Sequence, residues 1–155
     1  MFSLAMHTKT SYCQHNKGME IYAWCIVSNH VHLAFRSVGE LKPGQILGDF
    51  KRHTSKAIVK AIIENPKESR KENLLTTFKK AANKTTNVDK YQFWRHDNHP
   101  IEIWSNKVIS EKIRYIHNNP VDAGLVFRPE EYMYSSAVDY SGEKGLLSGV
   151  VLVAI

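Results

Sequence analysis

The sequence predicts a chain of mixed α and β structure. Residues 21–27 are rich in β-branched and aromatic side chains, residues 28–29 supply a turn, and residues 30–35 resume an alternating, strand-like pattern. Apolar side chains recur at helical spacing over residues 43–64 and again over residues 105–119. A β-hairpin and two long helices are therefore the expected framework.

The first expected element is a helix that ends at residue 18. Residues 8–18 have helical character, with Tyr12 and Cys13 expected to face inward and Gly18 as the terminating residue before the first strand. The only other cysteine is Cys25, and neither belongs to a Cys-x-x-Cys pair. A disulfide framework and a zinc knuckle are therefore not indicated, and a reducing cytoplasm is the expected location.

The second strand of the hairpin carries two histidines one residue apart. A period of two places Val31, Leu33 and Phe35 on one face, expected to be the core face. His30 and His32 then lie on the other face. Two imidazoles on one strand face can chelate a divalent ion if a third ligand comes from elsewhere in the fold. The pair could equally be surface decoration, so a second element has to decide.

Length and charge limit the possible functions. The chain has 155 residues, enough for one domain with a single core, and we expect residues 1–155 to form it. Lys and Arg number 21 against 15 Asp and Glu, a formal net charge of +6, which favours a polyanionic partner such as nucleic acid. We find neither a signal-peptide pattern nor a stretch approaching the ~20 apolar residues of a membrane span, so no membrane association is expected.

The predicted helix over residues 43–64 has an apolar side and a basic side. The apolar positions are Ile46, Leu47, Phe50, Ile58, Ile62 and Ile63, and the basic side carries Lys51, Arg52, His53, Lys56 and Lys60. The basic side is the best candidate for phosphate contacts, although a solvated helix surface looks the same in sequence. The dipeptide at 65–66, Asn-Pro, stops the helix.

Residues 67–104 are harder to interpret. An apolar island at residues 74–78 predicts a short helix followed by a mobile loop over residues 83–89. Residues 91–95 and 101–104 are strand-like and suggest a hairpin. Their aromatic residues Phe93, Trp94 and Trp104 fit a core better than base stacking, whereas Arg95 is a candidate DNA contact. The intervening loop adds His96 and His99 as further candidate metal ligands.

A helix capped by Ser105 is expected to run to Asn119, because Pro120 opposes further extension. Ile109, Ile113 and Ile116 form its narrow apolar stripe. Tyr115 and Asn119 lie together, one turn apart, some 100° away from that stripe. Tyr115 is either a half-buried tyrosine at the edge of the core or a nucleophile with Asn119 beside it as a ligand to metal or phosphate.

Three blocks of sequence together carry a family resemblance. They are SNHVHL at 28–33, YIHNNPVDAGLV at 115–126 and PEEYMYSS at 129–136. In this order they resemble the REP-associated tyrosine transposases, relatives of the single-tyrosine HUH transposases of bacterial insertion sequences. The resemblance covers most of the chain from about residue 10 onward.

The resemblance implies a fold, a site and a reaction. The fold would be α+β and ferredoxin-like, with a central antiparallel sheet covered by helices. His30 and His32 would hold Mg²⁺ or Mn²⁺, Asn119 would stand where the third ligand usually comes from, and Tyr115 would be the nucleophile. The protein would nick and rejoin single-stranded or hairpin DNA through a 5′-phosphotyrosine, in the cytoplasm at the nucleoid.

The chain also departs from the family pattern. Relatives usually begin with an additional strand, and here only residues 2–6 could stand in for it. A sheet one strand short exposes an edge, which favours a homodimer.

The shortened start also makes an alternative function credible, a binding protein for single-stranded or hairpin DNA that has lost nicking. A small-molecule metal hydrolase is disfavoured by the basic charge and the tyrosine block. Ser28 replaces a proline that is common in relatives.

Overall fold

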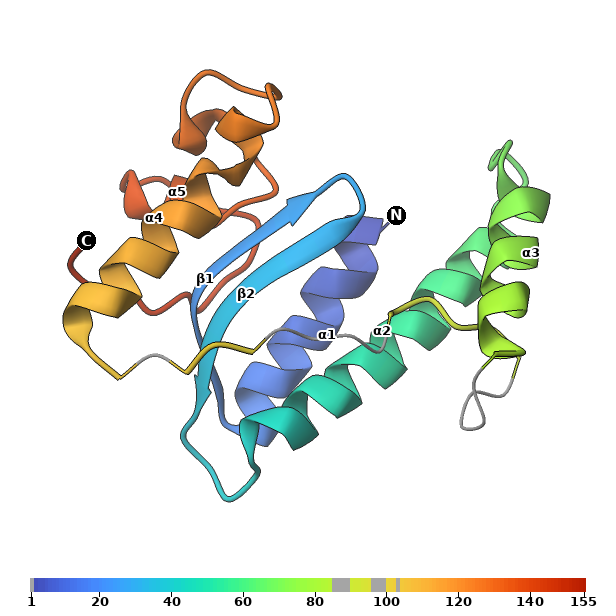
Figure 1. Ribbon diagram of the computed structural model, residues 1–155, viewed down its shortest axis with the longest axis horizontal. Coiled ribbons are helices and arrows are strands. Elements are labelled where there is room, and N and C mark those ends of the chain that lie inside the picture. The colour runs from blue at the N-terminus through green and yellow to red at the C-terminus, as the bar shows by residue number, and fades with distance from the viewer. Residues whose placement is uncertain (1, 85–89, 96–99, 103) are drawn as a thin grey trace. The chain divides into compact units, whose positions relative to one another are not determined.

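The computed structural model describes residues 2–84, 90–95, 100–102 and 104–155, with side chains from residue 10 onward. Its elements are α1 (Phe2–Lys17), β1 (Met19–Val27), β2 (His30–Ser37), α2 (Pro43–Glu64), α3 (Lys71–Ala82), α4 (Asn106–Asp122), the 3₁₀ helix η1 (Pro129–Glu131) and α5 (Ala137–Tyr140) (Figure 1). The expected α+β class is confirmed. The chain forms two compact units, Met1–Lys9 with Leu47–Pro100 and Thr10–Ile46 with Ile101–Ile155, which we describe separately.

The hairpin of β1 and β2 is the centre of the second unit. The strands are antiparallel, and Cys25 pairs with His32 while Val27 pairs with His30. The two-residue turn contains Ser28 at a φ of 38°, in the left-handed region that favours glycine. Proline has φ fixed near −65°. A proline at position 28 could therefore not adopt the φ that this turn requires.

Helix α4 packs on the face of the hairpin that carries the histidines, and here the expectation from the strand pattern is wrong. The core cluster consists of Ala23, Cys25, Val27, Ala34, Ile113 and Ile116. Strand pairing places the first four of these on the same face as His30 and His32. The residues expected to form the core face of β2 (31, 33 and 35) are only half-buried. The imidazoles therefore lie at the end of a buried face.

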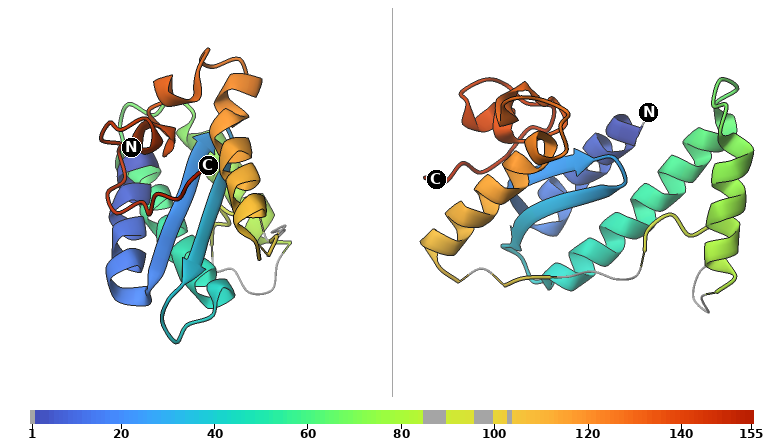
Figure 2. Two further views of the ribbon diagram at one scale, coloured as in Figure 1. Left: turned by 90° about the vertical axis from the view of Figure 1, so that its left-hand side faces the viewer. Right: turned by 45° about the horizontal axis from the view of Figure 1, so that its top comes forward.

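Helix α1, from Thr10 onward, lies on the opposite side of the hairpin from α4 (Figure 2). Cys13 is buried as expected, whereas Tyr12 is exposed, because neighbouring side chains on a helix point some 100° apart. Gly18 ends α1 with a φ of 65°, and a Cβ there would lie 2.8 Å from the nitrogen of Gly39. Residues 2–6 belong to α1 and add no strand to the sheet.

The C-terminal part of the chain follows the outer edge of β1. The N–H of Ile26 donates to the carbonyl of Tyr134 (2.9 Å), and the N–H of Ser136 donates to that of Trp24 (2.9 Å). Further along, residues 150–151 make a bridge to Ile21. In the part of the chain that the structure describes, the outer edge of β2 has no strand partner. One edge of the hairpin is therefore covered within the chain and the other is open.

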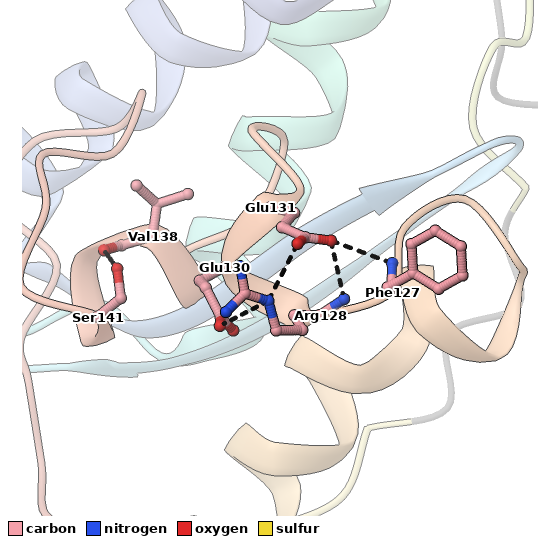
Figure 3. Close-up of polar contacts among 6 residues, drawn as sticks. All are labelled: Phe127, Arg128, Glu130, Glu131, Val138 and Ser141. Atoms are coloured by element: carbon pink, nitrogen blue, oxygen red, sulfur yellow. Dashed lines mark hydrogen bonds and ion pairs between the residues drawn. The ribbon is translucent and has the colours of Figure 1, made fainter.

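The Glu131 carboxylate holds the segment that leads from α4 to the outer edge of β1. Glu131 accepts the backbone N–H groups of Phe127 and Arg128, each at 3.1 Å, and the guanidinium of Arg128 at 3.0 Å (Figure 3). The Tyr132 hydroxyl then donates to the carbonyl of Ile26 (2.9 Å). The side chain of Phe127 is 94% exposed. These bonds fix the path from α4 back to β1.

Helix α4 runs three residues beyond its expected end, through Pro120 to Asp122. Pro120 removes one hydrogen-bond donor, but the helix then closes with two bonds of the Schellman type. The N–H of Leu125 donates to the carbonyl of Pro120 and that of Gly124 to Val121, both at 2.9 Å. Gly124 has a φ of 69°, as this motif requires. These two bonds satisfy the carbonyls of Pro120 and Val121 at the end of the helix.

The first unit contains α2 from Leu47, α3 and residues 90–95. The boundaries of α2 match the prediction, and its buried positions include Phe50, Ile58 and Ile62, whereas Ile63 is 46% exposed. The expected strands at 91–95 and 101–104 do not form among the described residues. Instead the Trp94 indole N–H donates to the hydroxyl of Thr54 (2.8 Å), within α2.

Aromatic packing explains why residues 91–95 do not form a strand. The Phe93 ring contacts Phe78 of α3, with centroids 5.4 Å apart, and the Trp94 ring contacts Phe50 of α2 at 6.3 Å.

Trp104, for which a core position was favoured, is 83% exposed. His96, His99 and the loop over 85–89 lie outside the described residues. None of the helices in the described part of the chain has the length and apolar character that crossing a membrane requires.

Candidate active site

Helix α4 presents Tyr115 to solvent next to the histidine strand. The Ser105 hydroxyl accepts the N–H of Val108 (3.3 Å) and caps the helix, as predicted. Burial of Ile113 and Ile116 against the hairpin then fixes the rotation of the helix. Tyr115 is 54% exposed, and its ring centroid lies 5.5 Å from that of His32, edge to face. The residue predicted to be displaced from the apolar stripe is therefore an accessible tyrosine beside an imidazole.

The two histidines lie close together at the start of β2. Their ring centroids are 4.7 Å apart and nearly perpendicular. His30 is exposed, and its Nδ1 lies 2.9 Å from the side-chain oxygen of Asn29. That contact favours the tautomer with the proton on Nδ1, which leaves the lone pair of Nε2 available. From the sequence, Asn29 is expected only as a turn residue. Its position directly before His30 was the signal that its side chain could also contact the imidazole.

His32 is less accessible than His30. Burial lowers the pKa of its imidazole below the ordinary value, and the nearby His30 lowers it further, while the neighbouring Asn119 amide partly opposes the shift. Its Nε2 is buried and has no hydrogen-bond partner among the residues that the structure describes. A buried polar atom without a partner is costly. Burial therefore favours the neutral form of the His32 ring, whose Nε2 faces no partner among the described residues.

Asn119 joins the same group of side chains. Its Nδ2 donates to the carbonyl of Tyr115 (2.7 Å), one turn back along α4. With the amide nitrogen bonded in this way, the amide oxygen is the atom left to accept or coordinate. The structure thus brings together His30, His32, Tyr115 and Asn119, which come from two elements about 85 residues apart in sequence.

This donor set fits a divalent ion. Among the described residues, no three His, Cys, Asp or Glu side chains gather closely enough to hold a metal. Two imidazole nitrogens and one amide oxygen could nevertheless supply three ligands and leave positions open for substrate oxygens. The partnerless Nε2 of His32 is the structural observation that supports this fit.

The basic residues expected to contact DNA lie in the first unit. Lys56 and Lys60 are exposed on α2, and Arg95 is exposed as well. Arg52 forms an ion pair with Asp49 (2.6 Å), and Lys60 lies 3.7 Å from Glu64. The Lys51 ammonium donates to the carbonyl of Arg95 (2.9 Å) and lies 5.9 Å from the Trp94 ring centroid. Lys51 therefore already has a contact within the protein. The acidic partners of Arg52 and Lys60 balance part of the positive charge on this side of α2.

One basic residue beside Tyr115 was missed in the sequence. The Lys112 ammonium lies 5.8 Å from the centroid of the Tyr115 ring. The three-residue spacing along a helix, which brings side chains to the same face, was the available signal.

Comparison with known proteins gives the family. The fold and the site define an α+β protein with an exposed tyrosine next to a pair of histidines. Residues 3–119 match a protein family described as Transposase IS200 like, which is 117 of the 155 residues. No curated protein and no solved structure matches the chain. The chain belongs to the family of IS200-like transposases, and its class is that of DNA-processing enzymes of transposition and recombination.

Proposed function

We propose that this protein nicks and rejoins single-stranded or hairpin DNA through a covalent link to Tyr115, as a transposase of the REP-associated kind acting at the nucleoid in the cytoplasm. The observation that carries the proposal is the exposed Tyr115 ring 5.5 Å from His32, at the end of a buried sheet face. A tyrosine kept out of the core beside two imidazoles is poorly explained by packing alone.

The reaction transfers a DNA phosphate group from its 3′ oxygen to the Tyr115 oxygen. The Tyr115 oxygen attacks the scissile phosphorus, a new P–O bond to tyrosine forms, and the bond to the 3′ oxygen breaks. The phenol loses one proton and the departing 3′ oxygen gains one, so the step needs no oxidant and no ATP. Because the phosphotyrosine retains a phosphodiester, a second 3′-hydroxyl can attack it and rejoin the DNA. Nicking and rejoining are then the same step in two directions.

His30, His32 and Asn119 are the residues that would hold Mg²⁺ or Mn²⁺. When bound, such an ion stabilises negative charge on the phosphate oxygens. The protein's own contribution is orientation. The contact with Asn29 favours one tautomer of His30, and α4 holds Tyr115 and Asn119 one turn apart.

The basic side of α2 supports a polyanionic substrate. The exposed Lys56 and Lys60, with Arg52, Arg95 and the half-buried Lys51, are the proposed phosphate contacts. Affinity for hairpin DNA should fall steeply with salt, because each neutralised phosphate releases counterions. Single-stranded or hairpin DNA should bind more tightly than plain duplex of the same length, and equal affinity for duplex contradicts this part of the proposal.

We also propose a homodimer. The outer edge of β2 has no strand partner in the described chain, and an open edge is readily covered by a second copy. Light scattering that gives the mass of one chain at all practical concentrations would overturn this.

The central test is the fate of the Tyr115 hydroxyl. Wild-type protein incubated with labelled hairpin-containing single strands and Mn²⁺ should yield a protein–DNA adduct that survives denaturation. Tyr115→Phe removes one exposed oxygen, so folding and hairpin binding should survive while the adduct disappears. Tyr134→Phe is the matched control and should still form the adduct. If the wild type forms none with any metal or hairpin, the protein is a DNA-binding module instead.

A separate test addresses the metal site. Calorimetry should show Mn²⁺ binding to the wild type and its loss in a folded His30→Ala, His32→Ala double variant, because both imidazole ligands are gone. Unchanged binding in that variant places the ion elsewhere.

A further inference from the structure

We propose that Lys112 is a further catalytic residue, whose ammonium contacts a non-bridging oxygen of the phosphate that Tyr115 attacks. The inference rests on the proposed function and extends it to a residue outside the His30, His32, Tyr115 and Asn119 group. Lys112 lies one turn before Tyr115 on α4, and its Nζ is 5.8 Å from the centre of the tyrosine ring.

Some cations of the same unit already have their charge balanced by a carboxylate. Arg36 is bound to Glu20 at 2.7 Å and Arg128 to Glu131 at 3.0 Å. The Lys112 ammonium, by contrast, makes no hydrogen bond or ion pair with any residue that the structure describes, and it lies against the Tyr115 ring. Lys112 is also half-buried rather than fully extended into solvent. A cation held against an aromatic face without a carboxylate partner remains available for an anionic ligand.

The geometry of attack brings that anion within reach. In a reactive complex the tyrosine oxygen and the phosphorus approach to about 3–3.5 Å. The non-bridging oxygens of the phosphate then lie near the edge of the Tyr115 ring, and lysine has four rotatable carbon–carbon bonds with which to move from the ring face to an oxygen. A charge-assisted N–H···O bond to phosphate is among the stronger hydrogen bonds. Lys112 takes no part in the proton transfer while the bond to Tyr115 forms and the bond to the 3′ oxygen breaks.

The same face of α4 thus holds three functional positions at helical spacing. Lys112, Tyr115 and Asn119 follow one another at intervals of three and four residues, so their side chains lie along one side of the helix. Helix α4 would supply the nucleophile, one ligand oxygen and one phosphate-binding cation, and β2 would supply the two imidazoles.

The experiment measures the rate constant of adduct formation at saturating hairpin DNA and Mn²⁺. Lys112→Met keeps the length of the side chain and removes its charge, and it should slow adduct formation about tenfold to a hundredfold. Lys112→Arg should restore most of the rate. Lys107→Met, at an exposed lysine in the first turn of α4, is the control and should react like the wild type. A wild-type rate in Lys112→Met overturns the inference and leaves the proposed function intact.

A modified substrate separates phosphate contact from mere orientation of the ring. A methylphosphonate at the scissile position replaces one charged non-bridging oxygen with a neutral methyl group. If Lys112 acts on that charge, the rate difference between wild type and Lys112→Met should shrink to less than about threefold on one methylphosphonate diastereomer. An undiminished difference on both diastereomers means that Lys112 only orients Tyr115, which refutes the inference. Absence of any wild-type adduct refutes the inference together with the proposed function.

Discussion

Mild acid should destabilise this protein through the buried side chain of His117. His117 lies on α4 and is 5% exposed, with its Nε2 2.8 Å from the Ser136 hydroxyl. Ser136 is in turn bonded to the backbone of Trp24 in β1. Burial lowers the pKa of His117 from the ordinary 6.5 to about 4. Its ring is therefore neutral in the folded protein at neutral pH and connects α4 to the C-terminal segment and the sheet.

The size of the effect follows from the two pKa values. The folded pKa lies below the unfolded one, so the unfolded state binds more protons between pH 6.5 and 4. Stability is then fully present above pH 6.5 and is lost as the pH falls toward 4. The full difference corresponds to about 3.4 kcal/mol at 1.36 kcal/mol per pKa unit. Between pH 7 and pH 5 the same values give a loss of about 2 kcal/mol.

The assay is urea unfolding at pH 7 and pH 5. The wild type should lose about 2 kcal/mol more than His117→Gln over this range, since glutamine cannot titrate there. His53→Gln, at an exposed position of α2, should lose as much as the wild type. Should His117→Gln fail to fold, the imidazole of wild-type His117 can be titrated directly by NMR. A titration midpoint near 6.5, or equal losses in wild type and variant, would refute the reasoning.

Two further predictions concern stability measured by urea unfolding. Gly18→Ala should cost about 1–3 kcal/mol, because alanine is strained at positive φ and its Cβ would meet the Gly39 nitrogen at 2.8 Å. Gly48→Ala, inside α2 with no atom within 4 Å of a Cβ, should instead be neutral or stabilise the protein by up to about 1 kcal/mol. Ile113→Ala should cost about 2–5 kcal/mol because Ile113 is fully buried against the hairpin, whereas the exposed Ile63→Ala should cost less than about 1 kcal/mol. Similar costs for the two glycine variants would contradict the backbone argument, and similar costs for the two isoleucine variants would contradict the burial argument.

Local patterns were sufficient for the framework of the candidate site. The two-residue turn, the hairpin and both boundaries of α2 follow from side-chain periodicity and turn chemistry over short windows. The same reasoning placed Tyr115 outside the apolar stripe of α4 with Asn119 one turn on, since helical angles depend on spacing alone. These features are local, and the residues that determine them are neighbours in the chain.

Other features depended on partners distant in sequence. The core face of β2 was assigned wrongly because alternation identifies two faces but not which of them a helix will cover. Residues 91–95 have strand-like composition, yet Phe93 and Trp94 pack on helices instead. Trp104 was expected in a core and is exposed. In each case the competing environments have similar local patterns, and packing decides between them.

The sequence by itself therefore determined the hairpin, the long helices and the helical face that carries the tyrosine, because backbone geometry converts spacing into direction. Only the tertiary structure brought Tyr115 to within 5.5 Å of His32 and laid the C-terminal segment along β1. These contacts join residues up to more than a hundred positions apart. They form because burying the Ile113 and Ile116 side chains against one face of the sheet leaves α4 a single rotation, and no local pattern specifies that face.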